Sequence, residues 1–226
     1  MIPLLTTLAL AGPTDQILEP GRYALTLRVS TLADAPWFPT LRGGSTSHVL
    51  VDLTEVGGAL VQRGQVCRVD IDGGAIARIE VPDAFLAAQP PREVVATVVD
   101  GTYRADLGLD IVGFSGTGAL PTSLASTIDW DEDGRPAATI VVHIPAIGAA
   151  EMYVVQAAQM VIEGPVTDGG ASGRIEVLRF EQATLGARPN WLAAKTQVRV
   201  DSKRSGFTLR PLPAQAGCAE VLRLAD

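Results

Sequence analysis

The feature that most constrains this chain is an alternation of apolar and polar side chains that recurs along most of its length. In the stretch RYALTLRVSTL, residues 22–32, every second residue from Tyr23 to Val29 is a large apolar one. Alternation with this period is typical of a strand that buries one face, whereas an amphipathic helix repeats its apolar residues at spacings of three and four. The sequence therefore predicts β-strands through most of the chain.

Turns rich in glycine and aspartate separate the predicted strands. The pair Asp100-Gly101 is a strong hairpin signal, because both central residues of a type I′ turn need positive φ angles. Only the segment DAFLAAQPP, within residues 82–92, predicts a short helix. Further tight turns are predicted at residues 57–58, 72–74 and 168–170.

About ten to twelve short strands joined by such turns predict an all-β fold, either an antiparallel β-barrel or a β-sandwich. We expect residues 12–226 to form a single β domain, since a chain of this length can bury one large core. A further expectation is that residues 22–110 and 150–212 are similar halves. Each contains the order strand, loop, Gly-Gly and strand, and each contains the tripeptide Arg-Val-Asp. The competing interpretation is a shared β-rich composition.

The acidic loop IDWDEDGRP has the spacing that indicates a specific chemistry. Asp129, Asp131 and Asp133 alternate along the chain, and Gly134 follows them. Calcium takes six to eight oxygen ligands, and carboxylates at positions 1, 3 and 5 of a loop converge when the chain turns sharply at position 6. The backbone carbonyl of Arg135 would supply the next oxygen. The sequence therefore predicts a calcium site at the three aspartates and Arg135.

This loop resembles the first half of the EF-hand, dockerin and thrombospondin-type calcium loops. The resemblance implies calcium as the ion, and the affinity of extracellular modules, about 10⁻⁴–10⁻³ M. The departure is at position 12, where an EF-hand has a bidentate glutamate and this chain has Ile140. Residues 138–144 are also β-branched and favour a strand rather than a helix. The competing interpretation is a solvated turn, in which Asp and Gly serve backbone geometry alone.

The N-terminal residues suggest export. Residues 2–11, IPLLTTLALA, are apolar and end in the small-residue pattern Ala9-Leu-Ala11 of a signal-peptide cleavage site, without a basic segment before them. We therefore expect residues 1–11 to be the remnant of a signal peptide and the protein to be periplasmic or extracellular. No other stretch approaches the ~18 apolar residues of a spanning helix, so we expect no transmembrane segment.

The two cysteines, Cys67 and Cys218, allow two interpretations. In an oxidising compartment they can form one disulfide that closes a long loop. Alternatively, Cys67 continues an inward alternation with Val69 and Ile71 and is a small buried hydrophobic residue.

Charge and histidine content narrow the function classes. The chain has 18 Lys and Arg against 25 Asp and Glu, a net charge of −7, which argues against nucleic-acid binding. A Ser-His-acid triad would need His48 or His143 beside an activated serine, and the segment GFSGT at residues 113–117 lacks the second glycine of a nucleophile elbow. We therefore expect a non-catalytic protein, with a hydrolase as an alternative.

Two features favour a binding role. Hydrophobic residues make up 47% of the chain, which permits a barrel whose interior holds an apolar small molecule or lipid. Trp37, Phe38 and Trp191 stand in segments that read as loops, where aromatic side chains often contact a partner. The competing interpretation is that these aromatic residues pack beneath their loops.

Three patterns together resemble uncharacterised secreted or periplasmic bacterial β-rich proteins. They are the Ala-x-Ala leader, the D-x-D-x-D-G-x-P loop before a strand, and the segment YVVQ at residues 153–156. The resemblance covers the C-terminal half and implies no known activity. Taken together, the observations above predict an exported, non-catalytic envelope protein with a binding or structural role toward an unknown protein or an apolar ligand, and with a calcium-stabilised loop.

Overall fold

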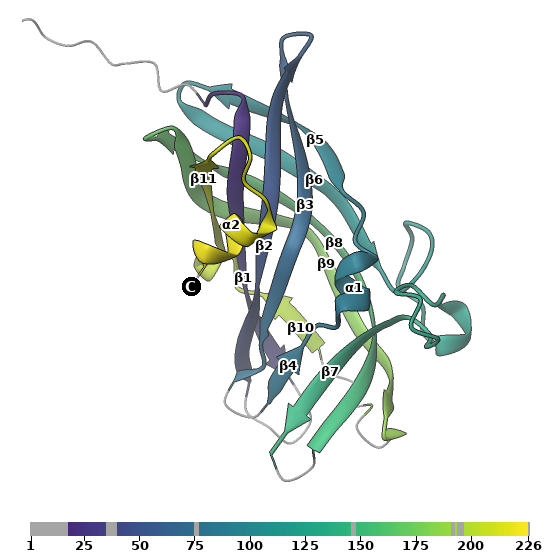
Figure 1. Cartoon of the computed structure of the whole chain (residues 1–226). Coiled ribbons are helices and arrows are strands. Elements are labelled where there is room, and N and C mark those ends of the chain that lie inside the picture. Colours follow the sequence, from purple (N-terminus) through teal and green to yellow (C-terminus); the bar gives the residue numbers. More distant parts are fainter. Residues whose placement is uncertain are drawn as a thin grey trace, which may run out of the picture.

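A computed structural model describes residues 18–34, 40–74, 77–145, 148–190, 193 and 197–225. Most of these residues form one antiparallel sheet of eleven strands, which confirms the predicted all-β fold (Figure 1). The strands are β1 (Gly21–Asp34), β2 (Leu41–Val56), β3 (Ala59–Asp72), β4 (Arg78–Glu80), β5 (Arg92–Val99), β6 (Thr102–Val112), β7 (Ala138–Ile144), β8 (Gly148–Thr167), β9 (Gly170–Arg188), β10 (Gln197–Val200) and β11 (Gly206–Leu212). The helices are α1 (Asp83–Ala87) and α2 (Cys218–Arg223), with 3₁₀ turns η2 (Leu124–Ser126) and η4 (Ser202–Arg204).

Eight strands close a ring through antiparallel pairings, in the order β1, β2, β3, β5, β6, β8, β9, β11 and back to β1. We call the end where β5 pairs with β6 and β9 with β11 the closed end; it is the upper end in Figure 1. At the other end, β4 and β7 stand between β3 and β8, and β10 pairs with β1. This is the open end, because no pairing in the described chain joins β10 to β9. Of the predicted alternatives, the pairings favour the barrel.

The predicted tight turns are confirmed at three of four places. Val56 pairs with Ala59 and Val99 with Thr102, so two residues form each turn. Asp100 and Gly101 have the positive φ angles that a type I′ turn requires, 48° and 69°. The third confirmed turn joins Thr167 to Gly170.

The turn predicted at residues 72–74 is wrong. Asp72 pairs with Arg78, so the connection from β3 to β4 runs over residues 73–77. The Asp72 carboxylate accepts a hydrogen bond from the Gly74 amide at 2.8 Å, a local bond that supports a wider loop.

The main core fills the closed end. Tyr103 is fully buried, lies 6.1 Å from Phe207 between ring centroids, and donates its hydroxyl hydrogen to Gln62. Burial raises the pKa of the Tyr103 hydroxyl. Around this pair, apolar side chains from the surrounding strands pack with almost no exposure, among them Leu25, Leu53, Ile162, Ile175 and Leu209.

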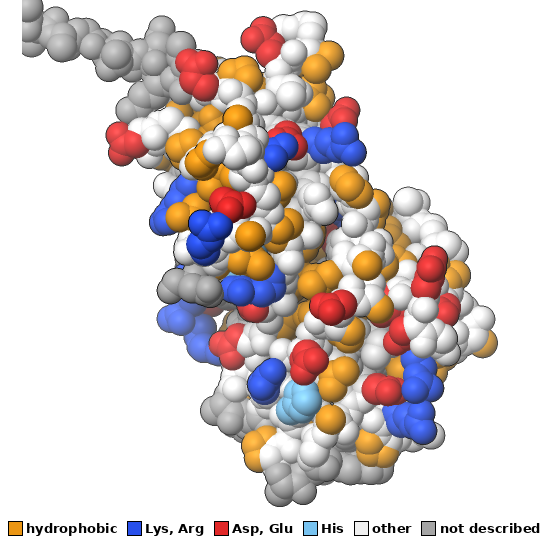
Figure 2. Space-filling view, viewed as in Figure 1, with side chains coloured by type: hydrophobic (Ala, Val, Ile, Leu, Met, Phe, Trp, Pro, Cys, Tyr) orange, Lys and Arg blue, Asp and Glu red, His pale blue; other side chains and the backbone are white. Residues whose placement is uncertain are grey.

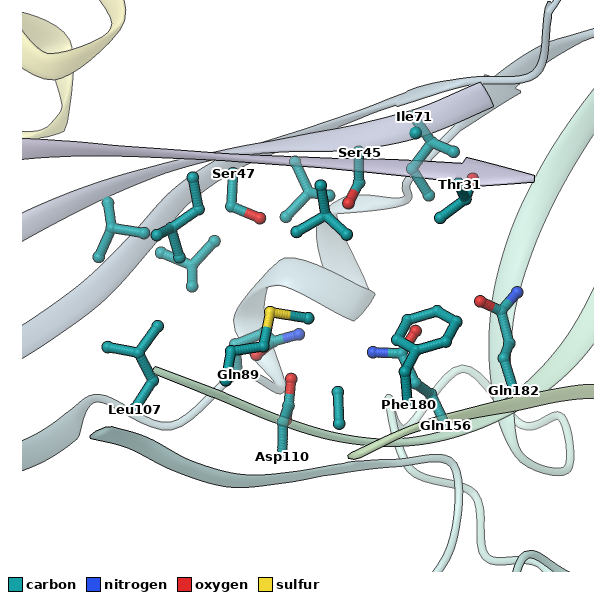
Figure 3. A pocket seen from close by; sticks show the side chains of 18 of the residues that line it. Thr31, Ser45, Ser47, Ile71, Gln89, Leu107, Asp110, Gln156, Phe180 and Gln182 are labelled. Atoms are coloured by element: carbon teal, nitrogen blue, oxygen red, sulfur yellow. The ribbon is translucent and has the colours of Figure 1, made fainter. Parts of the chain in front are cut away.

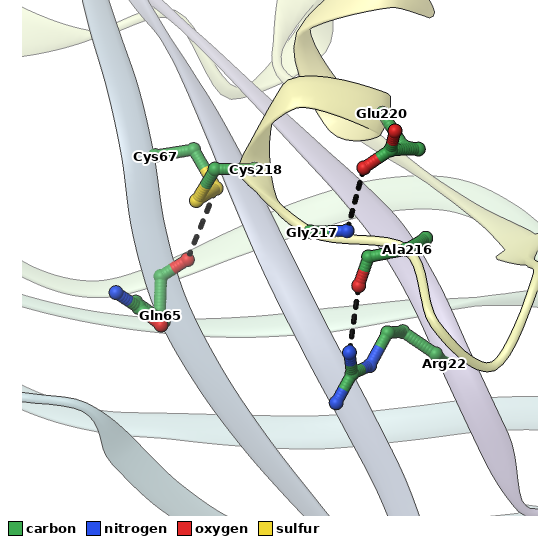
Figure 4. Close-up of a disulfide and its surroundings, with 7 residues drawn as sticks. All are labelled: Arg22, Gln65, Cys67, Ala216, Gly217, Cys218 and Glu220. Carbon is green, nitrogen blue, oxygen red and sulfur yellow. Dashed lines mark hydrogen bonds between the residues drawn. A yellow bond between two sulfur atoms is a disulfide. The ribbon is translucent and has the colours of Figure 1, made fainter.

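The C-terminal helix α2 is fastened to the outer wall by a disulfide between Cys67 and Cys218 (Figure 4). Nearby, Arg22 donates to the Ala216 carbonyl at 2.6 Å, and the Gly217 amide donates to the Glu220 carboxylate at 2.7 Å. The disulfide alternative for the two cysteines is thereby confirmed.

The interpretation of Cys67 as an inward-facing core residue is wrong. His48 pairs with Arg68 and Val49 with Val66, so Cys67 is the extra residue of a β-bulge. A bulge shifts the alternation of its strand. Val69 therefore faces the interior while Cys67 reaches α2 on the outside.

Within the described chain, neither helix has the length and apolar content needed to cross a membrane. The expectation of two similar halves, residues 22–110 and 150–212, stays a prediction. The expected signal-peptide remnant, residues 1–11, lies outside the described residues.

Candidate functional site

A cavity of about 400 Å³ lies inside the ring, between the main core and the open end (Figure 3). Side chains from β1–β3 face those from β6, β8 and β9 across it. The lining is mostly apolar and includes Leu25, Leu27, Val29, Val49, Val66, Val69, Ile71, Ile79, Val94, Leu107, Ile140, Ala158, Met160, Phe180 and Val198.

Small residues explain why this part of the interior stays hollow. Gly43, Ser45, Ser47 and Gly64 occupy inward positions on β2 and β3, where the closed end has leucine and valine. These residues do not reach the opposite wall. Ligand pockets of about 300–1,000 Å³ are common, and the mouths of β-barrels are among the places where they occur.

Polar side chains gather in one part of the lining. Arg92 and Asp110 form an ion pair, and Gln156 lies directly opposite Gln182 in the pairing of β8 with β9. Gln89, from the segment after α1, points into the same space in Figure 3. Together these groups offer both hydrogen-bond donors and acceptors to a bound molecule.

The electrostatics of this polar cluster are set by burial. Burial raises the pKa of the Asp110 carboxyl, and the neighbouring Arg92 guanidinium opposes that shift. The Asp110 side chain is 27% exposed. The pair is therefore partly screened by water and partly enclosed by the barrel wall.

Two β-bulges aim the polar cluster inward. On β6, Asp106 pairs with Val161 and Leu109 with Gln159, so the register shifts before Asp110. On β9, the register shifts at Leu178, an exposed residue, and this shift turns Phe180 and Gln182 toward the cavity.

Strict alternation along β6 would turn Asp110 outward, which is why the sequence did not predict its place in the cavity. The available signal is a charged residue within the apolar segment LGLDIV.

The predicted interaction residues Trp37, Phe38 and Trp191 lie outside the described residues. The chain on either side of the first two reaches the cavity, because Ala33 and Leu41 line it.

The acidic loop lies in the connection between β6 and β7 and brings its three aspartates together, as predicted. One carboxylate oxygen from each of Asp129, Asp131 and Asp133 lies within 4.8 Å of the others. This group is able to hold a metal ion. Trp130, between the first two aspartates, packs on Phe85 of α1 with ring centroids 5.1 Å apart, which fastens the loop to the barrel wall.

Backbone amides engage two of the aspartates from within the loop. Asp129 accepts hydrogen bonds from the amides of Asp133 and Gly134 at 3.1 and 3.0 Å. Asp133 accepts one from the amide of Arg135 at 2.8 Å. These bonds hold the loop in a compact turn, with φ of 81° at Gly134 as the predicted sharp turn requires.

Asp131 is the unusual member of the group. Its side chain is only 4% exposed; one oxygen accepts a hydrogen bond from the Thr139 amide at 2.9 Å, and the other is buried without a partner in the described chain. Burial raises the pKa of Asp131, and the charges of Asp133 and Asp129 add to the shift. A buried carboxylate beside two others is stabilised by a cation at the point where they converge.

The remaining predicted ligand positions behave differently. Arg135 directs its guanidinium to Glu151 at 3.4 Å. The role of its backbone carbonyl as a calcium ligand stays a prediction. Ile140, at the twelfth position, faces the cavity. It supplies no oxygen side chain, in line with the departure noted from EF-hand loops.

Each histidine considered for catalysis lies within hydrogen-bond distance of a carboxylate. His48 lies 3.1 Å from Asp70, and His143 lies 3.0 Å from Glu80. The two histidines belong to different strands, β2 and β7. The hydrolase alternative stays a prediction.

Comparisons of the chain with protein-family models, with curated proteins and with solved structures found no match.

Proposed function

We propose that this protein is a non-catalytic carrier that binds an apolar small molecule or lipid in the cavity of its barrel. The observation that carries the proposal is the hollow between the core and the open end, enclosed by apolar side chains and supplied with one polar cluster. Its volume of about 400 Å³ falls in the range of small-molecule sites.

The lining indicates the kind of ligand. Transfer of apolar surface from water to such a lining contributes about 25 cal/mol per Å² of surface buried. The amides of Gln156 and Gln182 and the pair Arg92–Asp110 would meet one polar group of the ligand. An uncharged amphiphile, with a hydroxyl, ester or amide at one end, fits both parts without leaving a buried charge unpaired.

We also propose that the carrier works in an oxidising compartment, the periplasm or the cell exterior. The disulfide Cys67–Cys218 supports this placement, because disulfides persist where thiols are not kept reduced.

Mass spectrometry of an organic extract tests the carrier proposal. The protein purified under native conditions should release an apolar compound in stoichiometric amount. The variant Ser47→Leu, which places bulk inside the cavity, should release much less, and Thr46→Leu, with the same bulk on the opposite face of β2, should match the parent. Equal extracts from both variants, or a parent that carries nothing, would contradict the proposal.

We propose calcium as the ion for the acidic loop, as a second and structural role. The buried, unpartnered oxygen of Asp131 supports it, and a hard cation suits a site made of oxygen ligands alone. With a dissociation constant of about 10⁻⁴–10⁻³ M, 10 mM calcium would stabilise the folded chain by about 1.4–2.7 kcal/mol.

Thermal unfolding in calcium and in chelator tests this second role. Asp131→Asn should abolish the calcium effect while leaving the chelated form at least as stable as the parent, because it removes the repulsion from Asp129 and Asp133. Glu132→Gln, in the same loop but outside the group, should keep the full effect. If calcium stabilises neither the parent nor the Glu132 variant, the loop is a solvated turn.

A further inference from the structure

The outer wall has a second hollow, a groove of about 840 Å³ beside α2. Its floor is formed by outward-facing residues of β3, β2, β1, β11 and β9, and its rims by η4 and the residues after α2, Leu224 and Ala225. Figure 2 shows Lys and Arg side chains around and below the position that α2 has in Figure 1. This groove is separate from the interior cavity, because neighbouring residues of one strand face opposite sides of the sheet.

The groove is basic although the protein is acidic. Its lining has five Lys and Arg side chains and one carboxylate, that of Asp70, whereas the whole chain has a net charge of −7. The basic residues are Arg28, Arg68, Lys203, Arg204 and Arg210.

Three of these cations are available for a ligand. Asp70 is engaged by His48 and Arg68, at 3.1 and 2.9 Å. By contrast, Arg28 and Arg210 are exposed, and among the residues that the structure describes neither they nor Lys203 form an ion pair. Like charges gathered without counter-charges raise the local positive potential and favour an anion.

The floor between these cations offers hydroxyl groups. Thr26 pairs with Thr208, and Thr208 pairs with Ser172, so three hydroxyl side chains form a row across β1, β11 and β9. Arg28 and Arg210 stand on either side of this row, two residues along from Thr26 and Thr208 on the same faces of their strands. The hydroxyl row and the two arginines therefore lie on the same outer face of neighbouring strands.

We propose that this groove binds a phosphate group. Arginine presents up to five donors and lysine three, and a phosphate has three strongly accepting terminal oxygens and a charge near −2. A carboxylate has only two oxygens and one charge, too few for three separated cations and the hydroxyls between them. The phosphate can belong to a soluble ester or to a lipid headgroup, and the two sources share this chemistry.

Calorimetric titration with pyrophosphate and sedimentation with vesicles test the proposal. The vesicles contain phosphatidylcholine with or without phosphatidic acid, whose headgroup is a phosphate monoester. Binding of pyrophosphate alone identifies a soluble source, and sedimentation only with phosphatidic acid identifies a headgroup; either result supports the phosphate site. Both measurements are repeated on Asp226→Asn, because Asp226 follows Ala225, a residue of the groove rim, in the sequence.

The decisive variant is Arg28→Gln with Arg210→Gln. It should weaken binding roughly tenfold or more, because it removes two charge-assisted contacts. The matched control is Arg63→Gln with Arg188→Gln, which removes two exposed arginines outside the groove and should bind like the parent. Lys203→Gln provides a second test if the double variant fails to fold. Absence of binding in both backgrounds, equal binding by the groove variant, or equal sedimentation with phosphatidylcholine alone would overturn the proposal.

Discussion

The two ends of the barrel are built from the same strands and have opposite interiors. On β2, Leu53 at the closed end is 1% exposed within the main core, whereas Ser45 and Ser47 toward the open end border the cavity. At the closed end eight strands form a narrow ring that large side chains fill. At the open end, β4, β7 and β10 enter the sheet and small or polar residues face inward. The packed core and the hollow therefore occupy separate parts of one sheet, and the proposed ligand binding belongs to the hollow part.

The largest predicted effect comes from truncating a leucine at each end of β2. Leu53→Ala should lower the free energy of unfolding by about 2–5 kcal/mol, because it opens a void in packed surroundings. Leu41→Ala, at the cavity rim, should cost less than about 1 kcal/mol. Urea unfolding of both variants measures the contrast, and similar losses would mean that the open end is packed like the core.

Removing the disulfide should affect stability without affecting the cavity. Replacement of Cys67 and Cys218 by serine should lower the free energy of unfolding by about 2–4 kcal/mol, because the cross-link restricts the unfolded chain. Ligand release into organic solvent should stay at the level of the parent, since both residues lie on the outer wall. A coupled loss of ligand would show that α2 supports the open end.

A larger side chain should change the free energy of unfolding in opposite directions at the two ends. Ser47→Leu fills part of the cavity and should raise the free energy of unfolding by about 0.5–2 kcal/mol. Ala105→Leu, at a position 1% exposed in the core, should lower it by about 1–3 kcal/mol through overpacking. Differential scanning calorimetry gives both values. Destabilisation by both variants would argue that the hollow is already filled.

The smallest predicted effect is a pH dependence confined to the cavity. Because burial raises the pKa of Asp110 above its ordinary value of 3.8, the folded chain binds more protons than the unfolded chain between the two values. Stability from this group should therefore fall as pH rises from 3.8 through the folded pKa and stay level above it.

Comparison of the parent with Asp110→Asn measures that dependence, since their difference in unfolding free energy should change with pH across this window. The corresponding difference for Tyr103→Phe, in the core, should be flat there, because the raised pKa of Tyr103 keeps its hydroxyl protonated. A flat difference for both variants would remove Asp110 as the titrating group.

The sequence predicts strands and turns well and the orientation of side chains less well. Alternation within residues 22–32 correctly placed Tyr23, Leu25 and Val29 inside the barrel. The orientations of Cys67 and Asp110 were not predictable, because a β-bulge shifts the alternation of each strand and depends on pairing with a distant strand. The composition indicated only that a cavity is possible, because alternation does not say whether the inward residues fill the space.

The sequence predicted which aspartates come together in the acidic loop, but it did not predict that Asp131 is buried. The spacing of Asp129, Asp131 and Asp133 identified a group that the structure brings together. The enclosure of Asp131 depends on the Thr139 amide of β7, and the fastening of the loop depends on Trp130 meeting α1. The helix α2 was missed because its six residues are too few for a helical period to stand out.

A fluorescence titration with N-phenyl-1-naphthylamine, an uncharged apolar probe, tests the central claim that the hollow end is a binding site. The parent, freed of bound ligand by organic extraction and refolded, should show a saturable increase at one probe per chain. Thr46→Leu should bind like the parent, and Ser47→Leu should lose most of the signal. An increase that does not saturate, or that Ser47→Leu leaves unchanged, would contradict the claim.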